Sequence, residues 1–147
     1  MFLPYWLPVL LWAAFIFLMS TEAGSTRRTS RIIGPILRWF YPQVRDETIA
    51  RVQFVARKTA HFCEYAWLAI LLWRARRQAA WNDPRPWRWS EAWFALGLAA
   101  LFAVSDEWHQ SFVPGRDAKP LDVLLDTAGA LGGLGMVRAL RDRRQLG

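Results

Sequence analysis

The chain of 147 residues has a single cysteine, Cys63, which excludes a disulfide within the chain and is expected to be a small apolar helix residue. It contains no internal repeat and no low-complexity tract. Residues 1–21 have no charged side chain, and the basic start of a cleaved signal peptide is missing from them. We therefore expect the first apolar segment to be a retained helix.

Apolar and basic side chains, in contrast, are abundant. The sequence is 54% hydrophobic with 10 Trp and 9 Phe, and its 19 Lys and Arg outnumber 12 Asp and Glu, which gives a net charge of +7. An excess of basic over acidic residues also occurs in nucleic-acid-binding proteins. Here the basic segments alternate with apolar runs, a pattern that favours contact with anionic lipid and predicts no nucleic-acid partner.

Four apolar runs predict an all-α integral membrane bundle of four transmembrane helices, forming a single domain over residues 1–147. The runs cover about residues 3–19, 59–73, 89–105 and 121–137. A span needs about 17–25 residues. The second helix is expected to begin earlier, near Asp46, because Asp46 and Glu47 suit a first turn.

The last three runs are short, so a soluble helical bundle is the alternative. Trp87, Trp89 and Trp93 beside Arg88 are typical of a membrane interface and favour the membrane. The first loop, about residues 20–45, mixes apolar and basic residues. It is expected to be an interfacial or re-entrant segment, or else a loop that packs on the bundle.

Three groups of polar residues lie at ends of these runs. Consecutive spans alternate in direction, so the start of the second, the end of the third and the start of the fourth share one side. Because ionisable groups at membrane depth are kept mainly for function, we expect the groups to form one functional cluster. The groups are Lys58, His61, Glu64 and Tyr65; then Asp106, Glu107, His109 and Gln110, with Arg116 beyond them; then Asp122 and Asp126.

The arginines predict the orientation of the cluster. The loop at 74–88 and the C-terminal tail are rich in arginine, and short segments of this kind stay in the cytoplasm. The cluster is then expected to face outward, with both termini in the cytoplasm. The arginines of the first loop favour the opposite orientation, but that loop is longer and partly balanced by acidic residues.

The candidate catalytic residues are His61, Glu64, Asp106 and His109. The spacing of His61 and Glu64 puts both on one helix face, where they can act in proton transfer or hold a metal. The candidate binding residues are Lys58, Tyr65, Glu107, Gln110, Arg116, Asp122 and Asp126. Lys58 and Arg116 suit a phosphate or carboxylate. Asp122 and Asp126 repel each other, so a divalent cation is one way to neutralise them.

Three motifs resemble the VanZ-like membrane proteins: RKTAHFCEY at 57–65, SDEWHQSFVPGR at 105–116, and D-x-x-x-D-x-x-G at 122–129. The resemblance extends over roughly residues 5–137. It implies a four-span protein of the bacterial cell membrane. The namesake is linked to resistance to the glycopeptide teicoplanin, and most relatives have no known biochemical activity. The family pattern usually has asparagine where this chain has Asp126.

Two functional hypotheses follow. In the first, the outward cluster binds or modifies a polar or anionic lipid-linked envelope molecule, with or without catalysis. In the second, the protein is a non-enzymatic membrane interaction module whose polar cluster is a structural network that caps the helix ends. Membrane lipids are expected partners in both cases. The sequence leaves the oligomeric state open, and a transporter would need an oligomer.

Overall fold

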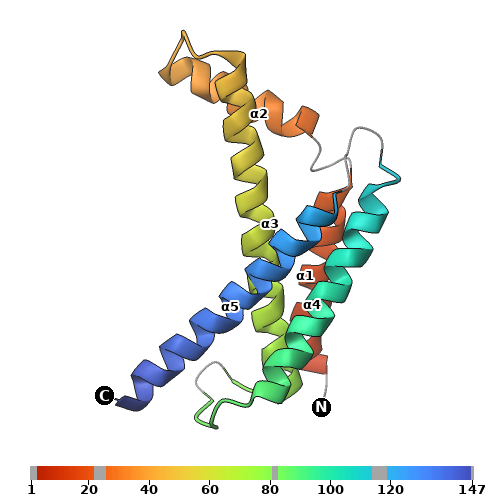
Figure 1. Cartoon of the computed structure of the whole chain (residues 1–147), viewed down its shortest axis with the longest axis vertical. Helices are drawn as coiled ribbons and strands as arrows, with labels where there is room; N and C mark the ends of the chain where they lie inside the picture. Colours follow the sequence, from red (N-terminus) through yellow and green to blue (C-terminus); the bar gives the residue numbers. More distant parts are fainter. Residues whose placement is uncertain (1–2, 22–25, 81–82, 114–118, 147) are drawn as a thin grey trace.

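Five α-helices make up the computed structural model, which describes residues 3–21, 26–80, 83–113 and 119–146 (Figure 1). The helices are α1 (Leu3–Ser20), α2 (Thr26–Phe40), α3 (Asp46–Arg77), α4 (Trp89–Gln110) and α5 (Pro120–Leu146). No strand occurs in these ranges, which confirms the all-α class. The central element is α3, which contacts each of the other four helices.

The ends of the helices follow local chemistry. α3 begins at Asp46, as expected, with two acidic residues in its first turn and three arginines in its last. It ends at Gln78, whose φ of 49° is left-handed and stops the helix. α5 begins with Pro120, a residue suited to the first helical position because it has no N–H to satisfy there. Polar ends extend α3, α4 and α5 beyond the apolar runs.

A stripe of alanines draws α4 close to its neighbours. Ala92, Ala95, Ala99 and Ala103 recur every three or four residues and are buried. Asp106 and Gln110 continue this stripe and are buried too. The helix therefore directs a carboxylate and an amide into the interior because both stand in register with its packing face.

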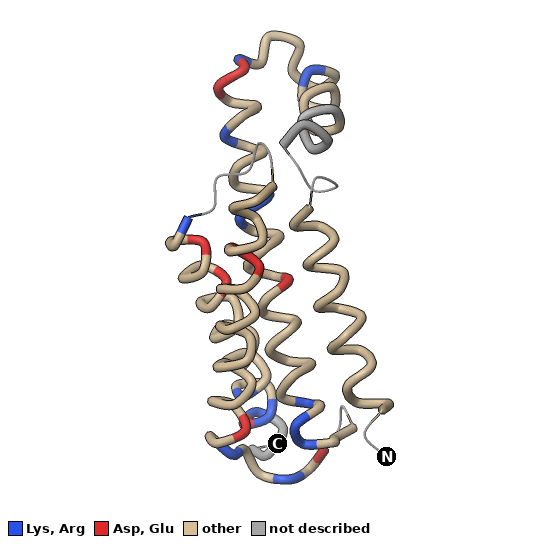
Figure 2. Tube along the Cα trace, turned by 90° about the vertical axis from the view of Figure 1, so that its right-hand side faces the viewer, with Lys and Arg blue, Asp and Glu red and all other residues tan. Residues whose placement is uncertain are grey.

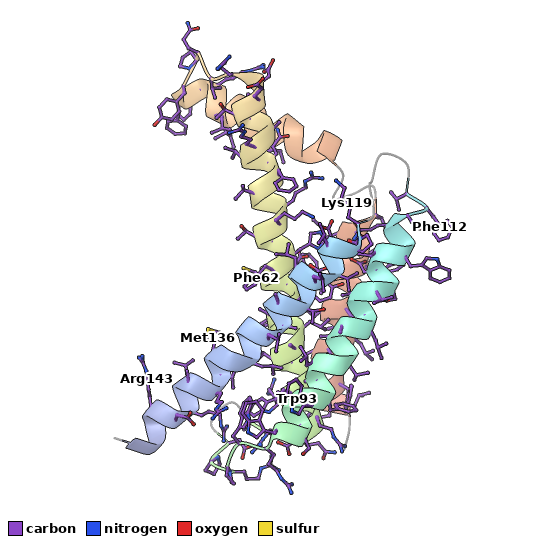
Figure 3. The ribbon with its side chains drawn as sticks, in the orientation of Figure 1. Phe62, Trp93, Phe112, Lys119, Met136 and Arg143 are labelled. Carbon is purple, nitrogen blue, oxygen red and sulfur yellow. The ribbon has the colours of Figure 1, made fainter. Side chains whose placement is uncertain are left out.

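Glycines set the register between α3 and α5, whose crossing lies at Phe62 (Figure 3). A Cβ atom on Gly129 would lie 2.3 Å from the carbonyl oxygen of Phe62, and one on Gly133 would lie 2.4 Å from that of Ala66. Only glycine permits this approach, which is a common packing mode between membrane helices. The crossing places the first two turns of α5 beside the middle of α3.

Two helices in the described parts of the chain are long and apolar enough to cross a membrane: α1 and the Pro120–Arg143 part of α5. α1 also exposes large apolar side chains around much of its surface, among them Leu10, Leu11 and Leu18. Exposed apolar surface of this kind marks contact with a membrane or a partner. The assignment of α3 and α4 as further spans stays a prediction.

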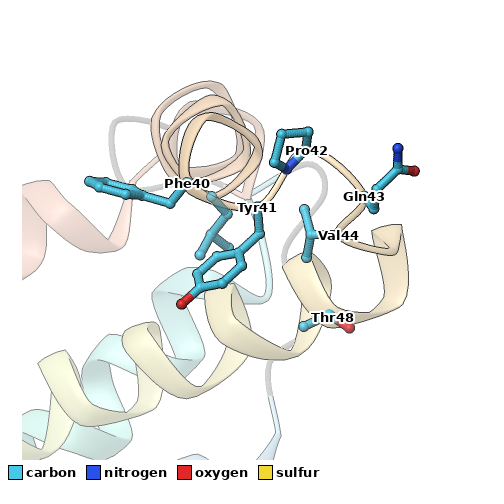
Figure 4. Close-up of a pocket in the computed structure, with 7 residues that line it drawn as sticks. Phe40, Tyr41, Pro42, Gln43, Val44 and Thr48 are labelled. Carbon is cyan, nitrogen blue, oxygen red and sulfur yellow. The ribbon is translucent and has the colours of Figure 1, made fainter.

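The first loop contains a helix, α2, which lies across the N-terminal part of α3 (Figure 1). Arg38 forms an ion pair with Asp46 at 2.6 Å. The turn between the two helices lines an open, largely apolar pocket, to which Tyr41 and Val44 contribute (Figure 4). In the described part of the chain, α2 contacts no helix but α3. It therefore does not return into the bundle as a re-entrant segment, and its interfacial placement stays a prediction.

Candidate functional site

Acidic residues gather where α4 ends and α5 begins, beside the middle of α3 (Figure 2). The structure thus brings together the three polar groups that alternating helix directions predicted on one side. We call this set the acidic cluster, and it comprises Lys58, His61, Glu64, Tyr65, Asp106, Glu107, Gln110, Asp122 and Asp126. Their functional roles stay predictions, and the contacts below show what each is able to do.

Lys58 and His61 of α3 meet the two aspartates of α5. Lys58 Nζ forms an ion pair with Asp122 Oδ1. His61 Nδ1 lies 3.8 Å from Glu64 Oε2 and 4.0 Å from Asp126 Oδ1. The glycine-mediated crossing produces these contacts, because it aligns one polar face of α3 with one polar face of α5. Asp122 is therefore neutralised by Lys58, which was expected to suit a phosphate or a carboxylate and here holds a carboxylate of the protein itself.

Asp106 forms a hydrogen-bonded network with α1. Ser20 Oγ donates to Asp106 Oδ2 at 2.7 Å, and Gln110 Nε2 donates to the same oxygen at 2.9 Å. Ser20 and Asp106 are completely buried. Sequence reasoning missed Ser20, although a polar residue closing an uncharged apolar helix was a usable indication.

Glu107 points toward the start of α5 and is buried. Its Oε2 accepts a hydrogen bond of 3.0 Å from the backbone N–H of Lys119, the residue just before α5. A carboxylate at a helix N-terminus satisfies a donor that the helix leaves unpaired and also favours the helix dipole. Glu107 therefore has a structural role in addition to its charge.

Asp126 and Tyr65 form the interior of the acidic cluster. Their exposed fractions are 1% and 0%. Within the described residues, neither oxygen of Asp126 has a hydrogen-bond partner, and neither does the hydroxyl of Tyr65. Asp106, Glu107 and Asp122 lie close enough for their charges to act on Asp126. A buried carboxylate in this setting needs a proton, a cation or a hydrogen-bond donor.

His109 is not part of this arrangement. The ring of His109 stacks on Phe17 of α1 with centroids 4.2 Å apart. No hydrogen bond joins it to Asp106 in the described ranges, where that carboxylate is held by Ser20 and Gln110. Arg116 lies outside the residues that the structure describes.

The acidic cluster carries more negative than positive charge. Five carboxylates, those of Glu64, Asp106, Glu107, Asp122 and Asp126, face one lysine and one histidine. Across the described residues, no group of three His, Cys, Asp or Glu side chains is arranged to hold a metal ion. The charge balance suits a ligand that donates hydrogen bonds or carries positive charge.

The opposite end of the bundle holds a second charged group, the Arg77 network, which consists of Arg77, Asp83, Arg85 and Glu91. Arg77 donates from Nε to Asp83 Oδ2 at 2.9 Å and from Nη1 to Glu91 Oε2 at 2.5 Å. Its Nη2 donates to the carbonyl of Arg85 at 3.0 Å, and Arg85 Nη2 donates back to the carbonyl of Arg77 at 2.8 Å. Sequence reasoning treated these arginines only as markers of orientation.

The Arg77 network lowers the pKa of Asp83. The main cause is the hydrogen bond from the Arg85 side chain, and further hydrogen bonds come from the Arg85 backbone and Arg77. These donors stabilise the charged carboxylate, so Asp83 stays ionised further into acid than a free aspartate. The loop that joins α3 to α4 is thereby tied to both helices.

Comparison with known families matches the VanZ/LLP1 profile to residues 5–141. The chain belongs to the VanZ/LLP1 family. The match includes all of the acidic cluster and the Arg77 network, and it confirms the resemblance found in the three motifs. Comparisons with curated proteins and with solved structures gave no significant match.

Proposed function

We propose that this VanZ-type protein is a multi-pass protein of the bacterial cytoplasmic membrane in which α1, α3, α4 and α5 all span the bilayer. α3 supports this placement by its length. His61 lies 16 residues before Arg77 on one continuous helix, which at about 1.5 Å per residue is about 24 Å. With Arg77 at one boundary of a hydrocarbon core about 30 Å thick, the acidic cluster lies inside the membrane, near the opposite boundary.

The length of α3 also gives the position of α2 relative to the membrane. Ile49, which packs near Gly34 of α2, lies 28 residues before Arg77, or about 42 Å along α3. From Arg77 at the hydrocarbon boundary, that distance exceeds the core of about 30 Å by about 12 Å, so Ile49 lies at the outer edge of the opposite head groups. The arginine-rich end then lies in the cytoplasm with both termini, and α2 lies at the outer head groups above the acidic cluster.

In this placement the acidic cluster binds the polar head of a lipid-linked envelope molecule. The observation that carries the proposal is the buried Asp126 carboxylate, which accepts no hydrogen bond from the described residues although it is surrounded by other carboxylates. Hydroxyl or amine groups of a ligand supply the missing donors. An anionic head fits less well, because Lys58 is already paired with Asp122.

The test compares the lipids that co-purify with the full chain from a bacterial membrane. Asp126→Asn is expected to lose several-fold of a specific envelope lipid without a lower melting temperature, because the amide removes a charge but keeps the shape. Asp142→Asn, which changes an exposed carboxylate on the same helix, is the control and should retain the lipid. An unchanged lipid profile in Asp126→Asn would overturn the proposal.

A second candidate is the structural network, and the Ser20–Asp106–Gln110 hydrogen bonds favour it. Ser20→Ala removes one donor to a buried carboxylate and should lower stability by about 2 kcal/mol. If Asp126→Asn also lowers stability by a similar amount and leaves lipid retention unchanged, the whole cluster is structural.

Variants at Asp126 also test the family's link to teicoplanin. We propose that any resistance conferred by this chain acts through the acidic cluster. The inhibitory concentration of teicoplanin in bacteria that express the wild-type chain should then fall to the control level with Asp126→Ala, at equal membrane abundance, whereas Asp126→Asn, which restores the residue usual in the family, should keep the resistance. Resistance that persists in Asp126→Ala would separate the phenotype from the cluster.

A further inference from the structure

A groove of about 230 Å³ lies between α4 and α5 at the arginine-rich end, remote from the acidic cluster. Trp89, Trp93 and Leu96 line it from α4, and Leu131, Leu134 and Gly135 line it from α5. Trp89 and Trp93 are more than half exposed, so the groove opens to the side of the bundle. Trp93 stands on α4 near this end of the bundle (Figure 3).

Gly135 differs from the glycines that pack α5 on α3. A Cβ atom on Gly129 or Gly133 would collide with the α3 backbone, whereas one on Gly135 would meet no atom within 4 Å. Helix packing therefore gives no reason for glycine at this position. Because glycine has no side chain, the groove stays unfilled where α5 faces the tryptophans of α4.

Hydrogen-bond donors surround the mouth of the groove. The guanidinium of Arg138 lies 4.5 Å from the centre of the Trp89 ring and borders the groove. Trp87 also lines the groove, and its Nε1 has no acceptor among the described residues. The carboxylate of Asp142 approaches Arg138 Nε only to 3.7 Å, too far for a good hydrogen bond.

We propose that this groove binds an anionic phospholipid of the surrounding bilayer. One acyl chain lies between the tryptophans of α4 and the leucines of α5, and the phosphate lies against Arg138. An apolar slot that ends in a cation and N–H donors matches an amphiphile with a negatively charged, acceptor-only head. The tryptophans place the mouth at head-group depth, where a cation near anionic lipid contributes about 1 kcal/mol.

Native mass spectrometry of the purified full chain, titrated with equal amounts of phosphatidylglycerol and phosphatidylcholine, tests this site. The wild-type protein should retain phosphatidylglycerol preferentially. Gly135→Leu fills the groove without touching α3 and should remove retention of the tightly bound lipid. Gly97→Leu is the matched control, because a Cβ atom there also meets nothing within 4 Å, and it should retain lipid as the wild type does.

The head-group part of the site has its own variants. Arg138→Gln should lower the preference for phosphatidylglycerol about five-fold, and Arg143→Gln, an exposed arginine further along the helix, should leave it unchanged. Equal lipid retention by Gly135→Leu and the wild type would overturn the proposal, as would an unchanged preference in Arg138→Gln. Neither result bears on the acidic cluster, whose test uses different residues and a different lipid.

Discussion

Both ends of this bundle bury charged side chains, but the two ends differ in how many hydrogen-bond partners those side chains have. At one end the guanidinium of Arg77, about 1% exposed, donates to two carboxylates and two carbonyls. At the other end Asp126 is equally buried, yet its oxygens have no donor in the described residues. A completely bonded charge holds a fold together, whereas an incompletely bonded one leaves capacity for a ligand or a proton.

The difference also appears in chain distance. The Arg77 network joins residues within 14 positions of one another, so it closes a local loop between α3 and α4. The acidic cluster collects side chains from α3, α4 and α5, and its Asp106 also bonds Ser20 of α1, which lies 86 positions away. It therefore forms only when the whole bundle has assembled, and it is sensitive to any change in helix packing.

The largest expected loss of stability is at the end of the bundle that holds the Arg77 network. Arg77→Ala leaves Asp83 and Glu91 without their buried partner and should reduce the free energy of unfolding by about 3 kcal/mol. Arg76→Ala, at an exposed neighbour that lies over the Phe94 ring, should reduce it by less than about 1 kcal/mol. Denaturant unfolding in detergent measures both, and equal losses would contradict the contrast between the two ends.

A smaller effect is expected where helix packing supports the acidic cluster. Gly129→Ala puts a methyl group against the Phe62 carbonyl, forces α5 away from α3 and should reduce stability by about 2 kcal/mol. Gly135→Ala, with open space at its Cβ, should be neutral or slightly stabilising. Thermal unfolding followed by circular dichroism distinguishes them, and a stable Gly129→Ala protein would show that the close crossing is not required.

The smallest effect concerns pH. The pKa of Asp83 is lower in the folded protein than in the unfolded chain, so its contribution to stability is complete above about pH 4 and is lost as the pH falls below that value. The melting temperature of the wild type should therefore decline in acid more steeply than that of Asp83→Asn. Parallel curves for the two proteins would show that the loop does not depend on this charge.

Much of the fold was predictable from local patterns. The apolar runs located four of the helices, and the acidic pair at Asp46 and Glu47 gave the start of α3 correctly. The alternation of helix direction was sufficient to bring Lys58, Asp106 and Asp122 to one side, because it needs only the order of the helices. The helix in the first loop was not predicted as such, since its apolar and basic residues also fit a loop.

The side-chain partners were not predictable, because they depend on the rotation and spacing of helices. Asp106 and His109 were expected in one cluster, whereas the alanine stripe of α4 turns Asp106 toward Ser20 and leaves His109 against Phe17. In the same way, the close approach at Gly129 decides that Asp122 meets Lys58. Glycine and alanine have no chemistry of their own, but here they determine which polar groups meet.

The length of α3 has a mechanical consequence. Its 32 residues contain neither proline nor glycine, so the helix has no hinge and moves as a rod about 48 Å long. α2 is fixed to one end of this rod through the Arg38–Asp46 pair, and Arg77 anchors the other. The α2 end of the rod and the Arg77 network are therefore held at a fixed separation, and the glycine crossing, with His61 and Asp126 beside it, lies between them.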